Sequence, residues 1–379
     1  MERPLALQRC DQFVGRTTNW LYDHLRFVPQ YTLVVFCDVL ANRDEFPLLK
    51  AERFNNQSFA RRLWLRIAED HVYPGDWWRL RRLSPDLLHS HFGYVAVDDL
   101  ILRRTFEIPW IVSFYGADLY QLGRRPDWQE KYARVFDQAT FILALGPMMA
   151  ARLRQIGCPE KKIVIHPLGV DIQSLPHKPR LLRAGETLKI LFAGTFREKK
   201  GVQYLIRAAA LAQRVGVRLE VHLVGDAMTK PGDRETKNEI FREIGKLGLE
   251  DLVTHHPFLS FQELIRLALC SHVFVAPSIT AVDGDAEGTP FVLQQLMATG
   301  MPAIATAHSD IPYLFGEHKH MLVPERDAKA IAERLQYYTE VPDRLGMDGM
   351  ALRDRTQQMF NVRLCANRLS ELYDAVLRT

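Results

Sequence analysis

The stretch DAEGTPFVLQQLMATG, residues 285–300, decides the fold that this sequence predicts. The apolar run HVFVAPS at residues 272–278 precedes it, and the apolar run PAIAT at residues 302–306 follows it. This order predicts a buried strand, a polar loop, an amphipathic helix and a second buried strand. A helix that starts directly after such a loop offers free backbone N–H groups and its positive dipole end to a ligand. The loop carboxylate Glu287 is then predicted to bind hydroxyl groups rather than phosphate.

Length and composition favour a globular protein of two domains. The chain has 379 residues, more than one ordinary core holds, which predicts two domains of roughly 150–200 residues. Its hydrophobic content of 47% and charged content of 25% are typical of soluble proteins, and no apolar run reaches the roughly 18 residues of a membrane-spanning helix. The first residues lack the pattern of a secretion signal, and the five cysteines lie far apart without metal-ligand spacing. We therefore expect a reduced, cytoplasmic protein.

Short apolar runs alternate with helical patterns along the chain, which predicts an α/β fold with parallel sheets covered by helices. In the first half, strands are predicted at residues 5–9, 32–37, 87–90, 110–114, 141–144 and 163–166, and helices at 18–27, 59–69, 95–105, 128–137 and 147–156. In the second half, strands are predicted at residues 189–193, 218–224, 253–255, 273–276 and 303–306, and helices at 202–215, 234–247, 261–269, 291–298 and 328–340.

A polar segment with two prolines, residues 171–186, predicts a linker between two Rossmann-like domains. The first domain is expected at residues 1–171 and the second at residues 172–360, with a C-terminal helix at about 361–379 packing back on the first domain. Ligands of such folds bind at the carboxyl ends of the strands. The two sheets are expected to face a central cleft with these ends.

A second candidate binding loop follows the apolar strand at residues 189–193. Gly194 ends this strand and lets the backbone approach a ligand. Arg197 and Lys200 come next and carry positive charge that suits a diphosphate. A basic helix start with solvated charges explains the same residues equally well.

Both loops resemble the signature loops of the family-4 retaining glycosyltransferases, which have the GT-B architecture of two facing Rossmann-like domains. In that family a Glu is followed eight positions later by a second Glu. Glu287 stands at the first of these positions, and Gln295 stands at the second. Lys200 and the glycine after it match the end of the family's phosphate loop, whose Arg position holds Thr195.

The resemblance implies roles for the second half of the chain. Glu287 would bind the transferred sugar together with backbone groups of Gly288 and Thr289, and Gln295 would bind the ribose. No metal ion and no cofactor are expected, and the co-substrate would be a UDP- or GDP-linked sugar. The remaining donor-binding residues would be Gly194, Thr195, Arg197, Lys200, Gly225, Phe258 and Leu259.

The first half is expected to bind the acceptor. One predicted strand ends in the sequence HSH, residues 89–91, and we expect its two histidines on opposite faces of the strand. His91, at the carboxyl end, is the one predicted to face the ligand, and a core histidine is the alternative. The strand at residues 110–114 leads into FYGAD, which is similar to exopolysaccharide enzymes of the colanic-acid type. Tyr115 would donate a hydrogen bond there, and Asp118 would orient the acceptor hydroxyl or cap the following helix.

Two further segments of the first half are candidates for contacts with charged partners. Gly15 and Arg16 follow the first strand and are expected on the acceptor side, where Arg16 suits a phosphate. The net charge is +4, and the excess of Lys and Arg lies in residues 1–170, most densely in Arg61–Arg82, where tryptophans are interspersed. This mixture suits an anionic membrane surface or single-stranded nucleic acid, and an ordinary solvated face is equally compatible. We favour the membrane, because no nucleic-acid-binding module is recognisable.

Together these features predict a retaining, metal-independent hexosyltransferase of cell-surface polysaccharide synthesis, located in the cytoplasm or at the inner face of the plasma membrane. The acceptor would be a saccharide or a lipid-linked saccharide, and no nucleic acid is expected as a partner. Two alternatives remain open at this point. One is a catalytically weak sugar-nucleotide-binding partner of another transferase, and the other is a sugar-nucleotide epimerase of the same fold.

Overall fold

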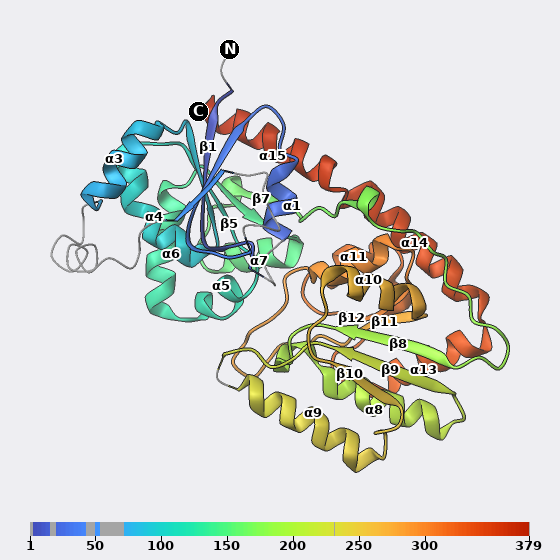
Figure 1. Cartoon of the computed structure of the whole chain (residues 1–379). Helices are drawn as coiled ribbons and strands as arrows, with labels where there is room; N and C mark the ends of the chain where they lie inside the picture. Colours follow the sequence, from blue (N-terminus) through green and yellow to red (C-terminus); the bar gives the residue numbers. More distant parts are fainter. Residues whose placement is uncertain (1–2, 16–19, 43–49, 54–71, 231, 379) are drawn as a thin grey trace. The chain divides into compact units, whose positions relative to one another are not determined.

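The computed structural model describes the chain apart from residues 1–2, 16–19, 43–49, 54–71, 231 and 379. The chain forms two compact units (Figure 1). The first unit comprises residues 1–169 and 362–379, and the second comprises residues 170–361. Every strand pair that the structure describes is parallel, so each unit is built from strands that alternate with helices.

The sheet of the first unit has the strand order β3-β2-β1-β4-β5-β6-β7. Its strands are β1 (Leu5–Phe13), β2 (Thr32–Leu40), β3 (Lys50–Arg53), β4 (Leu87–His91), β5 (Trp110–Ser113), β6 (Phe141–Ala144) and β7 (Ile163–Ile165). Its helices include α1 (Trp20–Arg26), α3 (Pro74–Leu83), α4 (Gly93–Phe106), α5 (Ala117–Tyr120), α6 (Pro126–Gln138), α7 (Pro147–Gln155) and α15 (Val362–Leu377).

The sheet of the second unit has the strand order β10-β9-β8-β11-β12-β13. Its strands are β8 (Leu188–Ala193), β9 (Leu219–Val224), β10 (Val253–His256), β11 (Val273–Ala276), β12 (Ala303–Thr306) and β13 (Leu322–Val323). Its helices include α8 (Val202–Arg214), α9 (Asp233–Leu247), α10 (Phe261–Cys270), α11 (Phe291–Ala298), α12 (Ile311–Phe315), α13 (Ala328–Glu340) and α14 (Asp343–Met359).

The strand β8 illustrates why the second sheet needs helices on both faces. Ile190 and Phe192 belong to one apolar cluster, together with residues of α8 and α13. Leu191 and Ala193 belong to a second cluster, together with residues of α11. Figure 1 shows α8 and α13 on one side of this sheet and α10 and α11 on the other. A strand buried on both faces is apolar throughout, which is the pattern that predicted it.

The prediction of an α/β fold with two Rossmann-like parallel sheets is confirmed, and each predicted strand is present. Two strands were missed. β3 is an edge strand with the sequence KAER, which has no apolar run, and β13 is only two residues long. The helix α14 was also missed, because its sequence contains two glycines and mixes polar and apolar residues. The predicted helix at residues 59–69 lies outside the described residues.

Both sheets have a point where the direction of strand order reverses. It lies between β1 and β4 in the first unit and between β8 and β11 in the second. At such a point neighbouring connections leave the sheet toward opposite faces, so a crevice opens at the carboxyl ends of the strands. The candidate sites described below lie at these two reversals.

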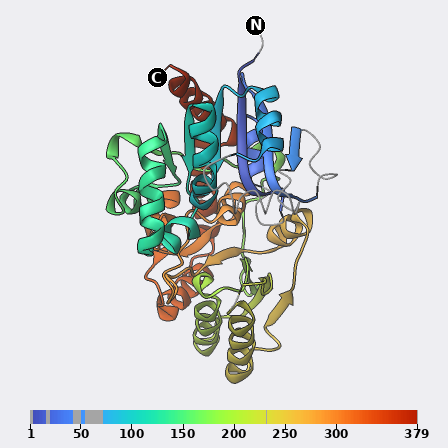
Figure 2. The same cartoon turned by 90° about the vertical axis from the view of Figure 1, so that its left-hand side faces the viewer.

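The C-terminal helix α15 belongs to the first unit. Figures 1 and 2 both show it alongside the strands of that unit. The Tyr373 hydroxyl lies 2.8 Å from His89 Nδ1 on β4, and the Tyr31 hydroxyl donates to Asp374 Oδ1. These contacts explain why the last residues return to a sheet formed at the other end of the sequence.

The chain passes between the units twice, after Gly169 and before Val362. The backbone N–H of Val170 donates to the carbonyl of Phe360 over 2.7 Å, which ties the two passages together. A Cβ atom at Gly169 would overlap Val362 Cα, whose backbone position leaves no room for adjustment. Glycine is therefore required at position 169 for a steric reason.

We expect Gly169→Ala to lower the free energy of unfolding by about 1–3 kcal/mol, because the new methyl group collides with backbone. Gly245→Ala is the matched control. Gly245 lies in the last turn of α9, where an added Cβ would meet only Glu250 Oε1, at 3.5 Å. The control should raise stability by roughly 0.5–1 kcal/mol. Urea unfolding midpoints test both changes, and equal midpoints for Gly169→Ala and wild type would contradict the steric argument.

Candidate active site

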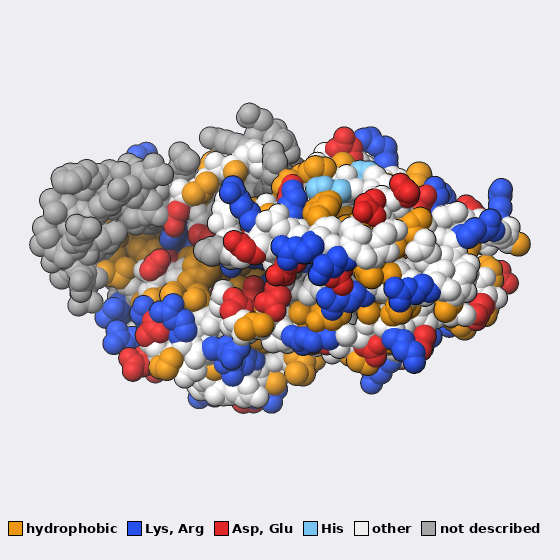
Figure 3. Space-filling model, turned by 90° about the horizontal axis from the view of Figure 1, so that it is seen from below, with side chains coloured by type: hydrophobic (Ala, Val, Ile, Leu, Met, Phe, Trp, Pro, Cys, Tyr) orange, Lys and Arg blue, Asp and Glu red, His pale blue; other side chains and the backbone are white. Residues whose placement is uncertain are grey.

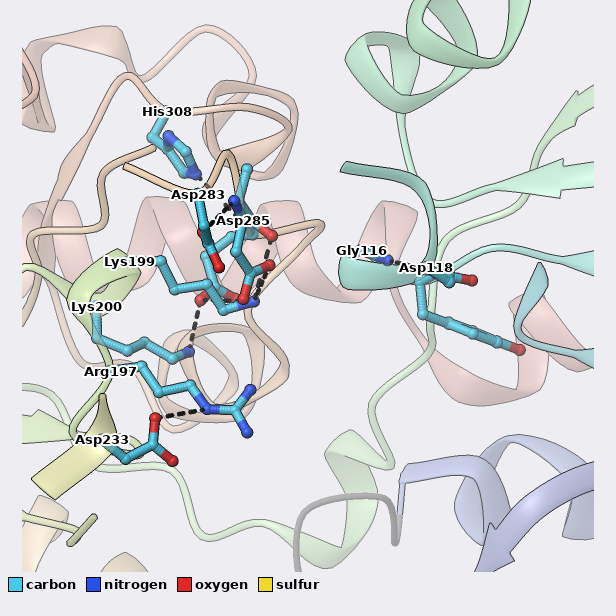
Figure 4. A network of polar contacts seen from close by, with 12 residues as sticks. Gly116, Asp118, Arg197, Lys199, Lys200, Asp233, Asp283, Asp285 and His308 are labelled. Carbon is cyan, nitrogen blue, oxygen red and sulfur yellow. Dashed lines mark hydrogen bonds and ion pairs between the residues drawn. The ribbon is translucent and has the colours of Figure 1, made fainter. Parts of the chain in front are cut away.

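The candidate site of the second unit lies at the carboxyl edge of its sheet, between β8 and β11. The connection after β8 covers residues 194–201 and contains a short 3-10 turn, η5 (Glu198–Lys200). The connection after β11 covers residues 277–290 and leads to α11. Figure 4 shows side chains of the two connections reaching toward each other.

Four charged side chains of these connections form a buried cluster. Lys200 Nζ lies 3.0 Å from Glu287 Oε1, and Lys199 Nζ lies 3.1 Å from Asp285 Oδ1 and 3.8 Å from Glu287 Oε1. Burial raises the pKa of Glu287, but the charges of Lys199 and Lys200 outweigh it and bring the pKa down to about 2. Glu287 is therefore ionised at neutral pH although only 7% of it is exposed.

Hydrogen bonds to backbone groups hold the two connections together around this cluster. The Glu198 carboxylate accepts the N–H of Val282, with its two oxygens at 3.1 and 3.2 Å. The Lys199 carbonyl accepts the N–H of Ile279 over 2.8 Å, and its ammonium donates to the carbonyl of Ala286 over 3.3 Å. The tripeptide 198–200 thus uses all three of its residues to fix the loop that carries Glu287.

Glycines make the close approach of the connections possible. Gly201 has φ +62°, and a Cβ atom there would overlap the carbonyl oxygen of Pro277. Gly225, which follows β9, has φ +136°, and a Cβ atom there would overlap the carbonyl oxygen of Gly194. Only glycine fits these two positions. The predicted donor residues Gly194 and Gly225 are therefore packed directly against each other.

The other predicted cation, Arg197, lies near the cluster and pairs with a residue of α9. Arg197 Nε is 3.5 Å from Asp233 Oδ1 (Figure 4), and the Arg197 N–H donates to the Thr195 carbonyl over 2.9 Å. Lys230, after β9, was missed by sequence reasoning. Desolvation lowers its pKa, and the positive charges of Arg197 and Lys199 contribute further. The cations at this edge lie beside carboxylates, so an anionic ligand would compete with Asp233, Asp285 and Glu287 for them.

Charges of both signs also lie side by side on the surface seen in Figure 3. There, basic and acidic side chains are interspersed over the visible face. A net charge of +4 on 379 residues is small, so the whole chain has little general attraction for anions. Anion binding at the second unit would depend on the arrangement of the few cations at the β8–β11 reversal.

The helix α11 starts with residues predicted to bind the sugar and the ribose. Gly288 and Thr289 are buried in front of it, and Gln295, predicted for the ribose, is half-buried on it. The adjacent Gln294 is fully buried, and neither atom of its amide has a hydrogen-bond partner among the described residues. The Thr289 hydroxyl also lacks such a partner. Sequence reasoning did not single out Gln294.

The predicted base-binding residues Phe258 and Leu259 follow β10 at the same edge of the sheet. The Phe258 side chain is 47% exposed, and Leu259 packs against the apolar cluster on the α11 side. The next residue, Ser260, starts α10 with a capping box, in which its hydroxyl and the Glu263 carboxylate satisfy each other's backbone N–H groups. The assignment of Phe258 and Leu259 to the base remains a prediction.

His308, which follows β12, was also missed, and it contacts the predicted site directly. The backbone N–H of Glu287 donates to His308 Nε2 over 3.0 Å. His308 Nδ1 lies 2.6 Å from Glu325 Oε1, beyond the end of β13. His308 sits in a polar segment with no local pattern that marks it. Its contact arises only when three distant connections meet.

In the first unit, the prediction that His89 and His91 point to opposite faces of their strand is wrong. Their ring centroids lie 4.1 Å apart. Residues two apart in a strand share a face, because successive side chains alternate. His91 is 0% exposed, and burial, followed by the charge of His24, lowers its pKa to about 3. It is therefore a neutral core histidine at the β1–β4 reversal.

Hydrogen bonds connect His91 to the half-buried Tyr115. His91 Nε2 lies 3.0 Å from the amide oxygen of Gln8, which can only accept, so Nε2 carries the proton. His91 Nδ1 then accepts from the Tyr115 hydroxyl over 2.6 Å. Burial raises the pKa of Tyr115 well above its ordinary value, so the phenol stays neutral. Its hydroxyl hydrogen is used by His91, and a hydrogen bond from Ser113 uses part of the accepting capacity of its oxygen.

Asp118 is tied to backbone rather than directed at a ligand. Its carboxylate accepts the N–H groups of Gly93, Tyr115 and Gly116 at 3.0, 3.1 and 2.8 Å, and Figure 4 shows Asp118 beside Gly116. Burial raises its pKa, although these amide hydrogen bonds oppose that effect. Both oxygens are thus occupied in joining the start of α4 to the connection after β5. This arrangement braces the backbone at the start of α4, and it matches neither the orientation of an acceptor nor a cap on the following helix, α5.

The remaining predicted positions of the first unit are described only in part. Gly15 is buried after β1, whereas Arg16 lies outside the described residues, as does the 61–71 part of the segment Arg61–Arg82. The described end of that segment is α3, where Trp78 is 68% exposed and Arg79 is 2.9 Å from Glu52.

Among the described residues, no helix has the length and apolar character needed to cross a membrane. No group of three His, Cys, Asp or Glu side chains in that part of the chain could hold a metal ion.

Comparisons with known proteins identify related sequences and structures. A model described as Glycosyltransferase Family 4 matches residues 33–174, and a model described as Glycosyl transferases group 1 matches residues 176–347. The chain is 30% identical over 296 residues to the putative colanic acid biosynthesis glycosyltransferase WcaL of Escherichia coli K12, which covers 77% of this chain and 71% of the relative. It is 29% identical to the amylovoran biosynthesis glycosyltransferase AmsK of Erwinia amylovora, covering 77% and 70%.

Solved structures show the same architecture. HepE of Anabaena, solved in complex with UDP and glucose, has a TM-score of 0.81 at 17% sequence identity, with 98% of this chain and 100% of that chain covered. Sucrose-phosphate synthase from Thermosynechococcus elongatus has a TM-score of 0.79 at 18% identity, covering 99% and 100%. At these identities the similarity concerns the fold alone, and it confirms the predicted GT-B class.

The depressed pKa of Glu287 predicts a pH-dependent contribution to stability. The ionised form is favoured by folding, so the contribution is complete above the ordinary value of 4.5 and is lost as the pH falls toward about 2. We expect Glu287→Gln to be less stable than wild type at pH 7, with a gap that narrows steadily below pH 4.5. Urea unfolding midpoints at pH 7, 5, 4 and 3 measure it. Glu333→Gln, on an exposed helix face, is the control, and a gap for Glu287→Gln that stays constant to pH 3 would contradict the assignment.

Proposed function

The chain belongs to glycosyltransferase family 4, and we propose that it moves a sugar from a nucleoside-diphosphate sugar to a saccharide or lipid-linked saccharide acceptor in cell-surface polysaccharide synthesis. The observation that carries this proposal is the Lys200–Glu287 pair at the β8–β11 reversal. A cation suited to phosphate and a carboxylate suited to sugar hydroxyls lie side by side there. The names of WcaL and AmsK, which refer to colanic acid and amylovoran synthesis, support the polysaccharide context.

We assign the donor to the second unit. Lys200 would turn from Glu287 to the diphosphate and stabilise the charge that develops on the leaving group, with Arg197 and Lys230 nearby. The Glu287 carboxylate, released from Lys200, would accept hydrogen bonds from sugar hydroxyls. The N–H groups of Gly288 and Thr289 would add to this contact. The co-substrate would be UDP- or GDP-linked, and the HepE complexes with UDP and with UDP-glucose support a uridine nucleotide as the first to test.

We propose that transfer occurs with retention of anomeric configuration and without a metal ion or other cofactor. The bond between the anomeric carbon and the phosphate oxygen breaks, and the acceptor oxygen forms its bond on the same face of the sugar. The departing diphosphate takes the proton of the acceptor hydroxyl. Positive side chains beside the diphosphate would supply the charge stabilisation that a metal ion provides in other enzymes.

We assign the acceptor to the first unit, with Tyr115 as the contacting residue. The Tyr115 hydroxyl donates to His91, so its oxygen would accept a hydrogen bond from an acceptor hydroxyl. His91 would act by fixing that orientation. Asp118 would act by shaping the connection after β5, because its oxygens are occupied by backbone N–H groups.

The decisive test is sugar release from a panel of UDP- and GDP-linked sugars by the wild type and Lys200→Met. We expect turnover of at least one donor, a reduction of about a hundredfold or more in Lys200→Met, and near-normal turnover in Lys329→Met. Lys329, 81% exposed on α13, is the control for loss of a positive charge. The assay is run with and without EDTA, and NMR of the freshly released sugar reports its anomeric configuration.

The outcomes of this assay distinguish the proposed glycosyltransferase from the two alternatives, a binding partner and an epimerase. A thermal shift with nucleotide but no sugar release points to a binding partner of another transferase. Conversion of one nucleotide sugar to its epimer points to an epimerase. Wild-type turnover in Lys200→Met rules out the assigned donor site, and an inverted anomer or inhibition by EDTA overturns the corresponding part of the mechanism.

We also propose that α3 contacts the inner face of the plasma membrane. Trp78 is 68% exposed, Arg81 and Arg82 are exposed beside it, and this combination suits an interface with anionic lipid. We expect the combined change of Trp78→Ser, Arg81→Glu and Arg82→Glu to weaken co-sedimentation with phosphatidylglycerol vesicles at least about tenfold. Arg124→Glu with Arg125→Glu changes charge elsewhere and should have little effect. Equal binding to neutral phosphatidylcholine vesicles would contradict the proposal.

A further inference from the structure

The loop that carries Glu287 is held at a second place, away from the lysines. The Glu287 N–H donates to His308 Nε2 over 3.0 Å, and His308 Nδ1 lies 2.6 Å from Glu325 Oε1. In Figure 4, His308 and Lys200 lie on opposite sides of the loop. His308 is 1% exposed, so water does not compete for these contacts.

The two partners of His308 determine where its proton lies. A backbone N–H can only donate, so Nε2 must be the unprotonated, accepting nitrogen. The proton of the neutral ring is therefore on Nδ1, where it is donated to Glu325. Glu325 thus fixes the one tautomer that can receive the Glu287 N–H.

Glu325 also holds the beginning of the same loop. Its second oxygen, Oε2, accepts the N–H of Thr280 over 2.9 Å. Arg326 lies 3.1 Å from that oxygen and donates to the Thr280 carbonyl as well. One carboxylate therefore anchors the loop at Thr280 directly and at Glu287 through the imidazole.

The backbone next to both side chains is in an unusual conformation. Ser309, which follows His308, has φ +45°, and Arg326, which follows Glu325, has φ +63°. Residues other than glycine seldom adopt this left-handed region, and they persist there when the surroundings fix them. Two such residues beside the two partners indicate that the directions of His308 and Glu325 are under structural constraint.

We propose that His308 and Glu325 are positioning residues for Glu287, and this rests on the proposed function of Glu287 as the sugar-binding carboxylate. Lys199 and Lys200 both lie beside the Glu287 carboxylate in this structure. When Lys200 turns to the diphosphate, the side chain loses one of its two cations, and the backbone anchor through His308 is what keeps Glu287 in place. The pair therefore acts on turnover more than on nucleotide binding.

The test compares three variants by kcat and KM for the nucleotide sugar of the panel that wild type turns over. His308→Leu fills the space but cannot accept the Glu287 N–H. His308→Gln brings an amide oxygen to about the place of Nε2 and can accept it. Glu325→Ala keeps the imidazole but removes the partner of Nδ1, so that either ring nitrogen can carry the proton. Hydrogen exchange of the peptide around residues 279–290, measured by mass spectrometry, reports the loop without relying on activity.

We expect His308→Leu and Glu325→Ala to lower kcat about ten- to a hundredfold with KM within about threefold, and His308→Gln to recover most of the loss. Amide exchange around Glu287 should quicken in His308→Leu and stay near wild type in His308→Gln. A kcat within twofold of wild type in His308→Leu, or His308→Gln as poor as His308→Leu, overturns the proposal. If His308→Leu does not fold, Glu325→Ala decides by the same limits.

The outcomes also separate this inference from the proposed function. A wild type that releases no sugar from any donor refutes the proposed function, whereas the exchange measurement still decides whether His308 anchors the loop. Unchanged exchange in His308→Leu and Glu325→Ala refutes the anchoring itself. Faster exchange in His308→Leu with unaltered kcat shows that the position of Glu287 does not limit turnover and overturns the positioning role.

Discussion

The close approach of backbone to backbone at the edge of the second sheet is the constraint on which its site depends. Gly201 lies against the Pro277 carbonyl, and Gly225 lies against the Gly194 carbonyl, with no room for a Cβ atom at either place. The connections after β8, β9 and β11 converge because of these glycines. Lysine and glutamate side chains from different connections can then meet at hydrogen-bonding distance. The chemistry of the site therefore follows from the absence of two side chains.

The charge of the site is balanced internally. Lys199 and Lys200 face Asp285 and Glu287, and the carbonyl of Ala286 accepts a further hydrogen bond from Lys199. Burying charges is costly unless each is paired and hydrogen-bonded, so this two-against-two arrangement is what allows Glu287 to remain ionised out of water. Close by in the sequence, the buried Gln294 amide and Thr289 hydroxyl have no hydrogen-bond partner within the described part of the chain. Unpaired buried polar groups are unfavourable for stability, and they are typical of places where function takes precedence over stability.

The sequence carried enough information for the sheets and for the central pair of the site. Apolar runs between turn signals predicted the strands, because buried parallel strands are apolar on both faces. Lys200 and Glu287 were predicted as binding residues because they lie in the loops that follow residues 193 and 276. It did not carry the pairing of Lys199 with Asp285 or the contact of His308 with Glu287. Those contacts join connections that are far apart along the chain, and their geometry is set by backbone positions that no local pattern encodes. The prediction that His89 and His91 point to opposite faces was wrong for a different reason. Side chains two residues apart in a strand point to the same face.

The two reversals differ in electrostatics, although the strand orders around them are alike. At β1–β4, Gln8, His91 and Tyr115 form a neutral network, because burial keeps the imidazole unprotonated and the phenol protonated. At β8–β11, the ionised Glu287 carboxylate lies beside the ammonium groups of Lys199 and Lys200. Neutral donors and acceptors suit saccharide hydroxyls, which carry no charge and need directional hydrogen bonds, whereas a diphosphate needs cations. One sheet plan can thus carry two sites of different charge, because the residues at each reversal, rather than the strand order, determine the chemistry of the site.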